Sequence, residues 1–102
     1  MTQDELKRLL DYNPETGKFY WKTNTGGRIK VGNHAGTMRT DLYIQIGINK
    51  KLYQAHRLAF LYMTGEIPPL VDHINRKPFD NRWDNLRSAT KYENALNVGA
   101  WR

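Results

Sequence analysis

Hydrophobic and polar positions change their period several times along the chain, and each change marks an expected element. Three leucines share one helical face and Thr2 forms a capping box with Glu5, so a short helix is expected over residues 3–11. The run NPETG at 13–17 joins Pro to Gly and predicts a turn. The next run, KFYWK at 18–22, alternates aromatic and charged residues, which favours a strand.

The middle of the chain predicts a loop followed by a strand pair. Residues 23–36 hold four of the eight glycines and are expected to form a mobile basic loop. Residues 41–48 alternate cleanly, which is typical of a half-buried strand, and NKK then makes a turn into a second strand at LYQA. The apolar face of the first strand comprises Leu42, Ile44, Ile46 and Ile48.

The last part of the chain predicts helix, strand, loop, strand and helix in that order. Residues 56–65 return to helical spacing and end on a glycine. VDHI at 71–74 is expected as a strand, and the polar stretch 75–84 as a loop that returns the chain to NLRSA. A second capping box then opens a helix over 91–97. We therefore expect one small α+β domain with antiparallel strands in its N-terminal part.

Composition narrows the class of protein. The chain has 102 residues, enough for one domain, with 39% hydrophobic and 25% charged residues, which is ordinary globular composition. It contains no cysteine, which excludes disulfides, cysteine-based zinc ribbons and thiol catalysis. The N-terminus is too polar for a signal peptide, and no apolar run approaches the ~20 residues of a membrane helix. A soluble, cytoplasmic protein with no membrane partner is expected.

The charge favours a polyanionic partner. The formal net charge is +6 and the isoelectric point about 9.7. Residues 1–50 and 51–102 each carry eight Lys or Arg and five Asp or Glu, so the charge belongs to the whole domain. Nucleic acid is the first partner to expect of such a surface, although a well-solvated basic protein would have the same composition.

The stretch VDHINRKPFDNRWDNLR and the residues after it combine side chains that suit phosphodiester chemistry. If the last helix packs across the strand pair, Asp72 and Asn94 converge and offer a carboxylate and an amide oxygen, a sparse hard-oxygen site suited to Mg²⁺. His73 would act as a base, since its ordinary pKa lets it accept a proton at neutral pH. Adjacent strand residues point to opposite faces unless the strand bends, so Asp72 and His73 share a site only with such a bend.

Further residues could complete this site. Asn85 would face His73 across the hairpin and hold its ring by a hydrogen bond, and arginine forks match phosphate oxygens. The arginines in reach are Arg76, Arg82 and Arg87. Taken singly, a histidine is more often structural, Asn85 could be a turn residue and Asn94 a polar helix position. Their joint order, D-H-x11-N-x8-N, favours the site.

The same residues resemble the HNH nuclease family, whose ββα-metal motif places a DH pair on one strand, an Asn at the second strand and a His or Asn on the helix. Over residues 52–97 the chain is most similar to the phage and intron-encoded, homing-endonuclease-like branch. The matching motifs are His56-Arg57-Leu58, Asp72-His73-Ile74-Asn75, Asp80-Asn81-Arg82, Asn85-Leu86-Arg87 and Thr90 to Asn94. His56 is interpreted as mainly structural.

The resemblance implies a DNA endonuclease that uses one divalent cation, Mg²⁺ or Mn²⁺. It implies His73 as general base, Asn85 as the residue that orients it, and Asp72 with Asn94 as metal ligands. The motif would occupy residues 52–102. Residues 1–51 would add core and DNA contact, with phosphate contacts from Arg28, Lys30 and Arg39, unless these side chains are plain scaffold surface.

A non-catalytic nucleic-acid-binding module on the same frame is the alternative function. Such a protein would be expected to have lost His73 or Asp72, and both are present. The sequence leaves open whether one strand or both are cut, which sequence is recognised, and whether the protein is a monomer or a homodimer.

Overall fold

The computed structural model describes residues 1–23 and 30–89, and the helix expected over 91–97 lies outside them. Three antiparallel sheets are present in the described part, with strand orders β1-β2-β3, β4-β5-β6 and β7-β8. The elements run α1 (Gln3–Leu9), β1 (Leu10–Asn13), β2 (Lys18–Trp21), β3 (His34–Ala35), β4 (Thr37–Met38), β5 (Ile44–Ile48), β6 (Lys51–Gln54), α2 (Ala55–Thr64), β7 (Leu70–His73), the 3-10 turn η1 (Trp83–Asn85) and β8 (Leu86–Ala89). This mixture of helices with antiparallel strands confirms the α+β expectation.

The first helix begins as expected but is shorter than expected. Thr2 caps it, since its side chain accepts a hydrogen bond from the backbone N–H of Glu5 at 3.2 Å. The helix ends at Leu9, and the prediction that it extends to residue 11 is wrong. Leu10 and Tyr12 fit the period of a strand as well as that of a helix, and pairing of Leu10 with Trp21 buries both side chains in the core.

The two hairpin turns follow from their sequences. In the turn between β1 and β2, Gly17 donates to the carbonyl of Asn13 at 2.7 Å and has a φ of +78°, which favours glycine. The turn between β5 and β6 holds Asn49 and Lys50 at φ +51° and +66°, the geometry of a two-residue hairpin loop.

Two expectations for the middle of the chain need correction. The loop expected over 23–36 contains β3, which pairs with β2 through Ala35 and Phe19. The strand expected from residue 41 begins at Ile44, and Leu42 is 47% exposed in a turn with φ +72°. The backbone N–H of Arg39 donates to the carbonyl of Tyr43, and the carbonyl of Arg39 accepts from the N–H of Leu42. These bonds close the turn, so turn formation overrides the alternating pattern at this end.

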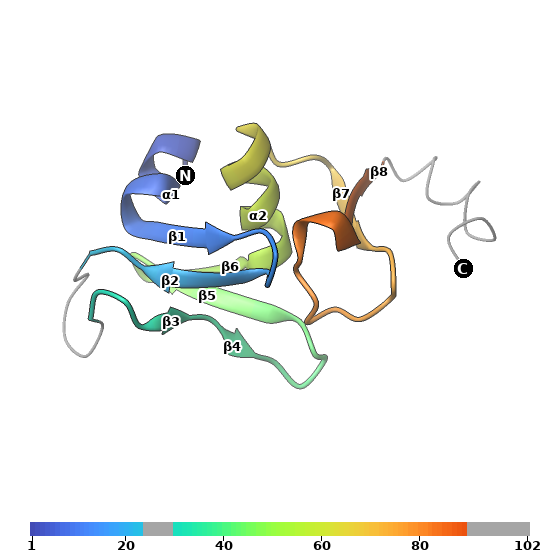
Figure 1. Ribbon diagram of the computed structural model, residues 1–102, viewed down its shortest axis with the longest axis horizontal. Coiled ribbons are helices and arrows are strands. Elements are labelled where there is room, and N and C mark those ends of the chain that lie inside the picture. The colour runs from blue at the N-terminus through green and yellow to red at the C-terminus, as the bar shows by residue number, and fades with distance from the viewer. Residues whose placement is uncertain (24–29, 90–102) are drawn as a thin grey trace.

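The core joins the N-terminal sheet, the second sheet and α2 (Figure 1). Helices α1 and α2 lie side by side, and the β7–β8 hairpin lies on the other side of α2 from α1. The hairpin is fixed to this core by Leu86, which is buried, and by Trp83, whose ring lies 4.7 Å from that of Phe60 on α2. None of the helices in the described residues is long and apolar enough to cross a membrane.

Candidate active site

The acidic residue and the histidine of the DH pair lie together where β7 ends. Asp72 pairs with Arg87 and His73 with Leu86 across the hairpin. His73 is the last residue of the strand, and a turn follows it. Asp72 and His73 both border a pocket of about 200 Å³. Its lining residues are Tyr43, Asp72, His73, Arg76 and Pro78.

The ring of His73 is held by Asn81, a residue to which the sequence pattern gave no role. Nε2 of His73 lies 2.7 Å from Oδ1 of Asn81, and the asparagine is only 2% exposed. An amide oxygen can only accept, so Nε2 donates and Nδ1 is the nitrogen left without a proton. The only signal in the sequence that could have indicated Asn81 was its place in Asp80-Asn81-Arg82, one of the motifs shared with the HNH family.

Asn85 closes the loop rather than holding the ring. Its Nδ2 donates to Oδ1 of Asn75 at 3.0 Å and to the carbonyl of Asp80 at 2.8 Å, while its Oδ1 accepts from the backbone N–H of Asn75 at 3.0 Å. The prediction of a hydrogen bond between Asn85 and the His73 ring is therefore wrong. The η1 turn places Leu86 opposite His73, and this directs the buried Asn85 amide into the loop.

The loop also holds an ion pair that engages one of the expected phosphate-binding arginines. Arg82 donates from Nε and Nη2 to the two carboxylate oxygens of Asp80, each at 2.9 Å. These bonds, with one from Asn75, lower the pKa of the Asp80 carboxyl to about 2. The forked geometry keeps the Arg82 guanidinium at the loop, where it stabilises the loop conformation.

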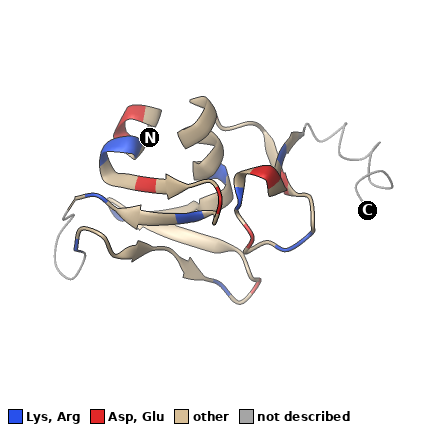
Figure 2. Ribbon diagram, in the orientation of Figure 1, with Lys and Arg blue, Asp and Glu red and all other residues tan. Residues whose placement is uncertain are grey.

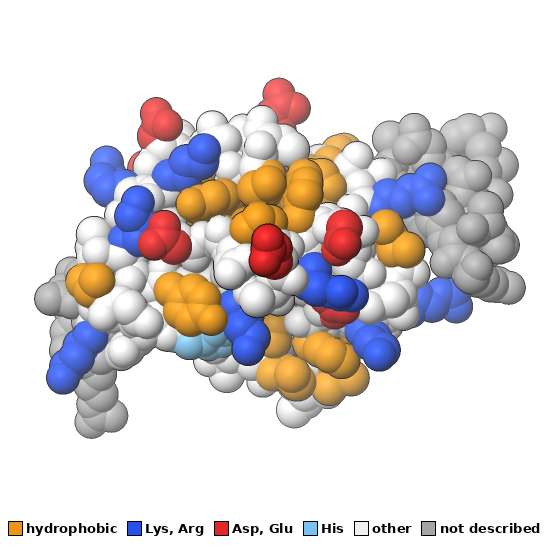
Figure 3. Space-filling model, viewed as in Figure 1, with side chains coloured by type: hydrophobic (Ala, Val, Ile, Leu, Met, Phe, Trp, Pro, Cys, Tyr) orange, Lys and Arg blue, Asp and Glu red, His pale blue; other side chains and the backbone are white. Residues whose placement is uncertain are grey.

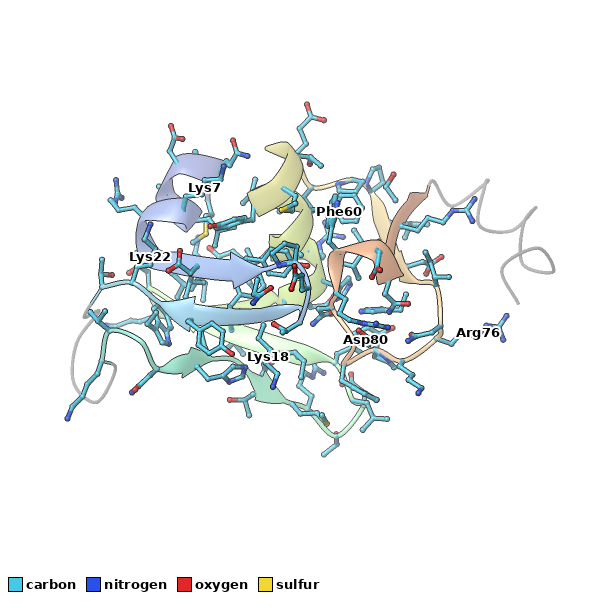
Figure 4. All side chains as sticks on the ribbon, viewed as in Figure 1. Lys7, Lys18, Lys22, Phe60, Arg76 and Asp80 are labelled. Atoms are coloured by element: carbon cyan, nitrogen blue, oxygen red, sulfur yellow. The ribbon has the colours of Figure 1, made fainter. Side chains whose placement is uncertain are left out.

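The other expected nucleic-acid contacts are spread over the surface. Arg76 is exposed beside the pocket and points away from the body of the molecule (Figure 4), and Arg87 is exposed on β8 opposite Asp72. Nη2 of Arg39 lies 3.4 Å from Oδ2 of Asp41, and Lys30 is exposed near the start of β3. Lys30 precedes β3 and Arg39 follows β4, so the two short strands lie between these basic residues. Arg28 and Asn94 lie outside the described residues.

Basic and acidic side chains alternate on the visible face of the molecule (Figure 3). Along the ribbon of the hairpin loop, acidic and basic residues also alternate (Figure 2). The net positive charge is therefore distributed, and contacts to a polyanion depend on which basic side chains lie near the pocket.

A second histidine packs behind the first. The ring of His56 lies 4.9 Å from that of His73 and 5.5 Å from that of Tyr43, and His56 is 5% exposed. Burial lowers the pKa of His56 from 6.5 to about 4, with smaller contributions from His73 and Arg57. His56 is therefore neutral at pH 7, and its buried ring packs against that of His73 with the ring planes at 58°.

This lowered pKa predicts a loss of stability in acid. The unfolded chain binds a proton at His56 near pH 6.5 and the folded protein only near pH 4, so the unfolded state holds more protons between these values and is favoured as pH falls. We expect this group to lower the free energy of unfolding by about 2.5 kcal/mol between pH 7.5 and 4.5. Urea unfolding of the wild-type protein and of His56→Phe at both pH values measures this loss of free energy of unfolding. An equal loss in the two proteins would contradict the assignment.

The donor set near the pocket fits a hard divalent cation. Within residues 1–23 and 30–89 no group of three or more His, Cys, Asp or Glu side chains gathers into a metal site. Asp72 supplies one carboxylate at the pocket, and the chain has no thiolate to favour a soft metal. A cation held here would need oxygen ligands besides Asp72, which suits Mg²⁺ or Mn²⁺ better than zinc.

Comparisons with known proteins point to one family. The HNH endonuclease family model matches residues 53–96. A solved structure described as DNA binding and cleavage by the HNH homing endonuclease I-HmuI is similar, with 26% sequence identity and a TM-score of 0.66. That similarity covers 90% of this chain and 52% of the other, so the chain spans about half the length of I-HmuI. A search of curated proteins found no significant match.

The family match covers α2, the DH pair and the hairpin loop, and the structural similarity extends through the N-terminal strands. The two comparisons therefore agree on the segment that carries the pocket. Residues 53–96 of this chain match the HNH endonuclease family, and the chain is similar in fold to the HNH homing endonuclease I-HmuI.

Proposed function

We propose that this protein is a metal-dependent endonuclease that hydrolyses phosphodiester bonds in DNA. The observation that carries the proposal is the pairing of a carboxylate and an oriented imidazole at one pocket: Asp72 and His73 border it, and the bond to Asn81 leaves Nδ1 of His73 unprotonated. The match of residues 53–96 to the HNH endonuclease family supports the reaction class, and the DNA cleavage described for I-HmuI supports the substrate.

In the proposed reaction His73 acts as the general base. Nδ1 accepts a proton from a water molecule as the water oxygen bonds to phosphorus, and the bond from phosphorus to the leaving sugar oxygen breaks. Asn81 keeps Nε2 protonated, so the ring offers only Nδ1 as the acceptor. Neutral His56 adds no positive charge beside the ring, so it does not oppose the protonation of His73.

Asp72 and Asn94 are the proposed ligands of a single Mg²⁺, with Mn²⁺ as a substitute. The bound ion would polarise the scissile phosphate and offset the charge on the leaving oxygen. In the described part of the chain Asp72 supports this assignment, because its side chain borders the same pocket as the proposed base.

The proposed DNA contacts near the pocket come from two arginines. Arg76 is exposed at its edge, and Arg87 is exposed beside Asp72 on the paired strand. Arg82 is already bonded to Asp80, so we assign it to loop structure first and to phosphate binding only where DNA could share its remaining N–H groups. Arg28, Lys30 and Arg39 are proposed as more distant phosphate contacts, which position a protein on DNA without reading sequence.

Cleavage of a supercoiled plasmid tests the proposed function. We expect conversion to open-circle or linear DNA with Mg²⁺ or Mn²⁺ and no conversion with EDTA, because without the cation the charge on the leaving oxygen is not offset. The form of the product distinguishes a nicking enzyme from one that cuts both strands. Single-stranded DNA should be tested under the same conditions.

The alternative function has a different outcome in the same experiment. A non-catalytic nucleic-acid-binding module would retard DNA in a gel shift yet cleave neither plasmid nor single strands with either metal. That result would contradict the nuclease proposal, and it would leave the similarity of residues 53–96 to the HNH family unchanged.

A further inference from the structure

The turn between β1 and β2 contacts the loop that carries Asn81, although the two are far apart in sequence (Figure 1). The hydroxyl of Tyr12 donates to the backbone carbonyl of Asn81 at 2.6 Å. The carbonyl of Pro14 accepts from the backbone N–H of Trp83 at 2.9 Å. These two bonds hold the main chain on both sides of Arg82.

The third contact is a close backbone approach. A Cβ atom built on Gly17 would lie 2.3 Å from the carbonyl carbon of Asn81 and 2.4 Å from the backbone nitrogen of Arg82. Only a residue without a side chain fits at that distance. We call Tyr12, Pro14 and Gly17 together the hairpin brace.

The side chain of Asn81 extends this contact to the proposed base. Its backbone is held by the hairpin brace, its side chain is buried, and its Oδ1 lies 2.7 Å from Nε2 of His73. The connection therefore runs from the N-terminal hairpin through a single residue to the imidazole ring. A side chain orients a partner well only when its own position is fixed.

We propose that the hairpin brace is a positioning device for the HNH site: by fixing the backbone of Asn81 it fixes the hydrogen bond that orients the His73 ring. Tyr12, Asn81 and the N-terminal hairpin would then be required for the geometry of the site and not only for stability. The catalytic consequence rests on the proposed nuclease function, whereas the effect on the ring can be measured without any activity.

The surroundings of Tyr12 suit this role. Its ring lies 4.8 Å from that of Phe19 and 5.7 Å from that of Tyr62, so the hydroxyl oxygen is held in a fixed place. Burial, with the nearby charges of Asp84 and Asp80, raises the pKa of the Tyr12 hydroxyl, which therefore remains a donor. Tyr12→Phe would remove the hydrogen bond while it keeps the packed ring.

Nuclear magnetic resonance of the full chain, without metal or DNA, gives the first test. An imidazole N–H held in a hydrogen bond exchanges slowly with water, so wild-type protein should give a visible Nε2–H resonance that disappears in His73→Gln. We expect this resonance to be lost in Asn81→Ala and to exchange faster in Tyr12→Phe. Tyr62→Phe is the matched control, since the Tyr62 ring belongs to the same aromatic cluster, and it should leave the resonance unchanged.

Single-turnover cleavage with the same variants gives the second test. Removal of a side chain that orients a reacting one typically costs on the order of 10- to 100-fold in activity, and we expect this for Asn81→Ala with unchanged affinity for DNA. Tyr12→Phe should lower the rate by a smaller factor, and Tyr62→Phe should not lower it. If Asn81→Ala does not fold, Tyr12→Phe is sufficient for the test, because the phenylalanine keeps the packed aromatic ring.

Several outcomes would overturn the inference. If Tyr12→Phe leaves both the resonance and the cleavage rate at wild-type values, the hairpin brace has no positioning role. If Tyr12→Phe lowers only the unfolding temperature, its hydrogen bond is structural and the inference again fails. If wild-type protein cleaves no DNA, the proposed function fails, while the resonance still decides the inference independently.

Discussion

Replacement of His73 by alanine is expected to lower the single-turnover rate of DNA cleavage by ~10²- to 10⁴-fold, the usual contribution of a general base. The expectation rests on the position of the ring at the pocket with Asp72 and on the bond that leaves Nδ1 free of a proton. Affinity for DNA should change little, because the basic side chains remain. Cleavage rates at saturating protein and gel-shift titrations separate the two effects.

The matched control for this prediction is His34→Ala. His34 is exposed on β3, where its ring contacts Tyr20 and does not border the pocket with Asp72. The His34→Ala variant should therefore cleave DNA at the wild-type rate. Cleavage by His73→Ala at that same rate would show that the base is another group, and the proposed roles of Asn81 and the hairpin brace in catalysis would fall with it.

Replacement of Gly17 by alanine is expected to lower the free energy of unfolding by about 3 kcal/mol or more. Two costs add: a φ of +78° disfavours a side chain by ~1–2 kcal/mol, and a methyl group forced into packed backbone costs ~1–3 kcal/mol. The atoms that it would meet belong to the main chain of Asn81 and Arg82, which cannot move aside as a flexible side chain could. Urea unfolding followed by circular dichroism measures the loss.

Gly32→Ala separates the two costs. Gly32 also has a positive φ, +91°, but among the described residues no heavy atom beyond its chain neighbours lies within 4 Å of a Cβ built on it. Its replacement should cost only the conformational part, ~1–2 kcal/mol. Equal losses at the two positions would mean that the close approach of the hairpin to the loop adds nothing to stability.

Local patterns in the sequence were sufficient for most of the elements. The Thr2 cap, the two-residue turn at Asn49 and Lys50, and the glycine at the end of α2 each depend on neighbours within a few residues. The β7–β8 hairpin likewise follows from a short strand, a polar loop and a second short strand. Such features are set by backbone conformation and capping, which sequence carries directly.

The two errors in element boundaries have different causes, one from a distant segment and one from a local turn. Leu10 suits both a helix and a strand, and pairing with Trp21 decided for the strand. The alternation that began at Leu42 gave way to a turn held by Arg39 and Tyr43. At Leu10 a contact made only in the folded chain decided the outcome, whereas at Leu42 bonds within residues 39–43 did so.

The candidate site likewise combines features that the sequence indicates with features that only the folded structure decides. The sequence by itself determined the chemical groups, since the order of the DH pair and the later asparagines pointed to the HNH family before any geometry was known. Only the tertiary structure decided which asparagine meets the ring: Asn81 bonds His73 while Asn85 closes the loop. It also decided that a glycine in the N-terminal hairpin packs on that loop. A hydrogen bond joins two groups whose separation depends on every turn between them, and spacing along the chain does not encode that distance.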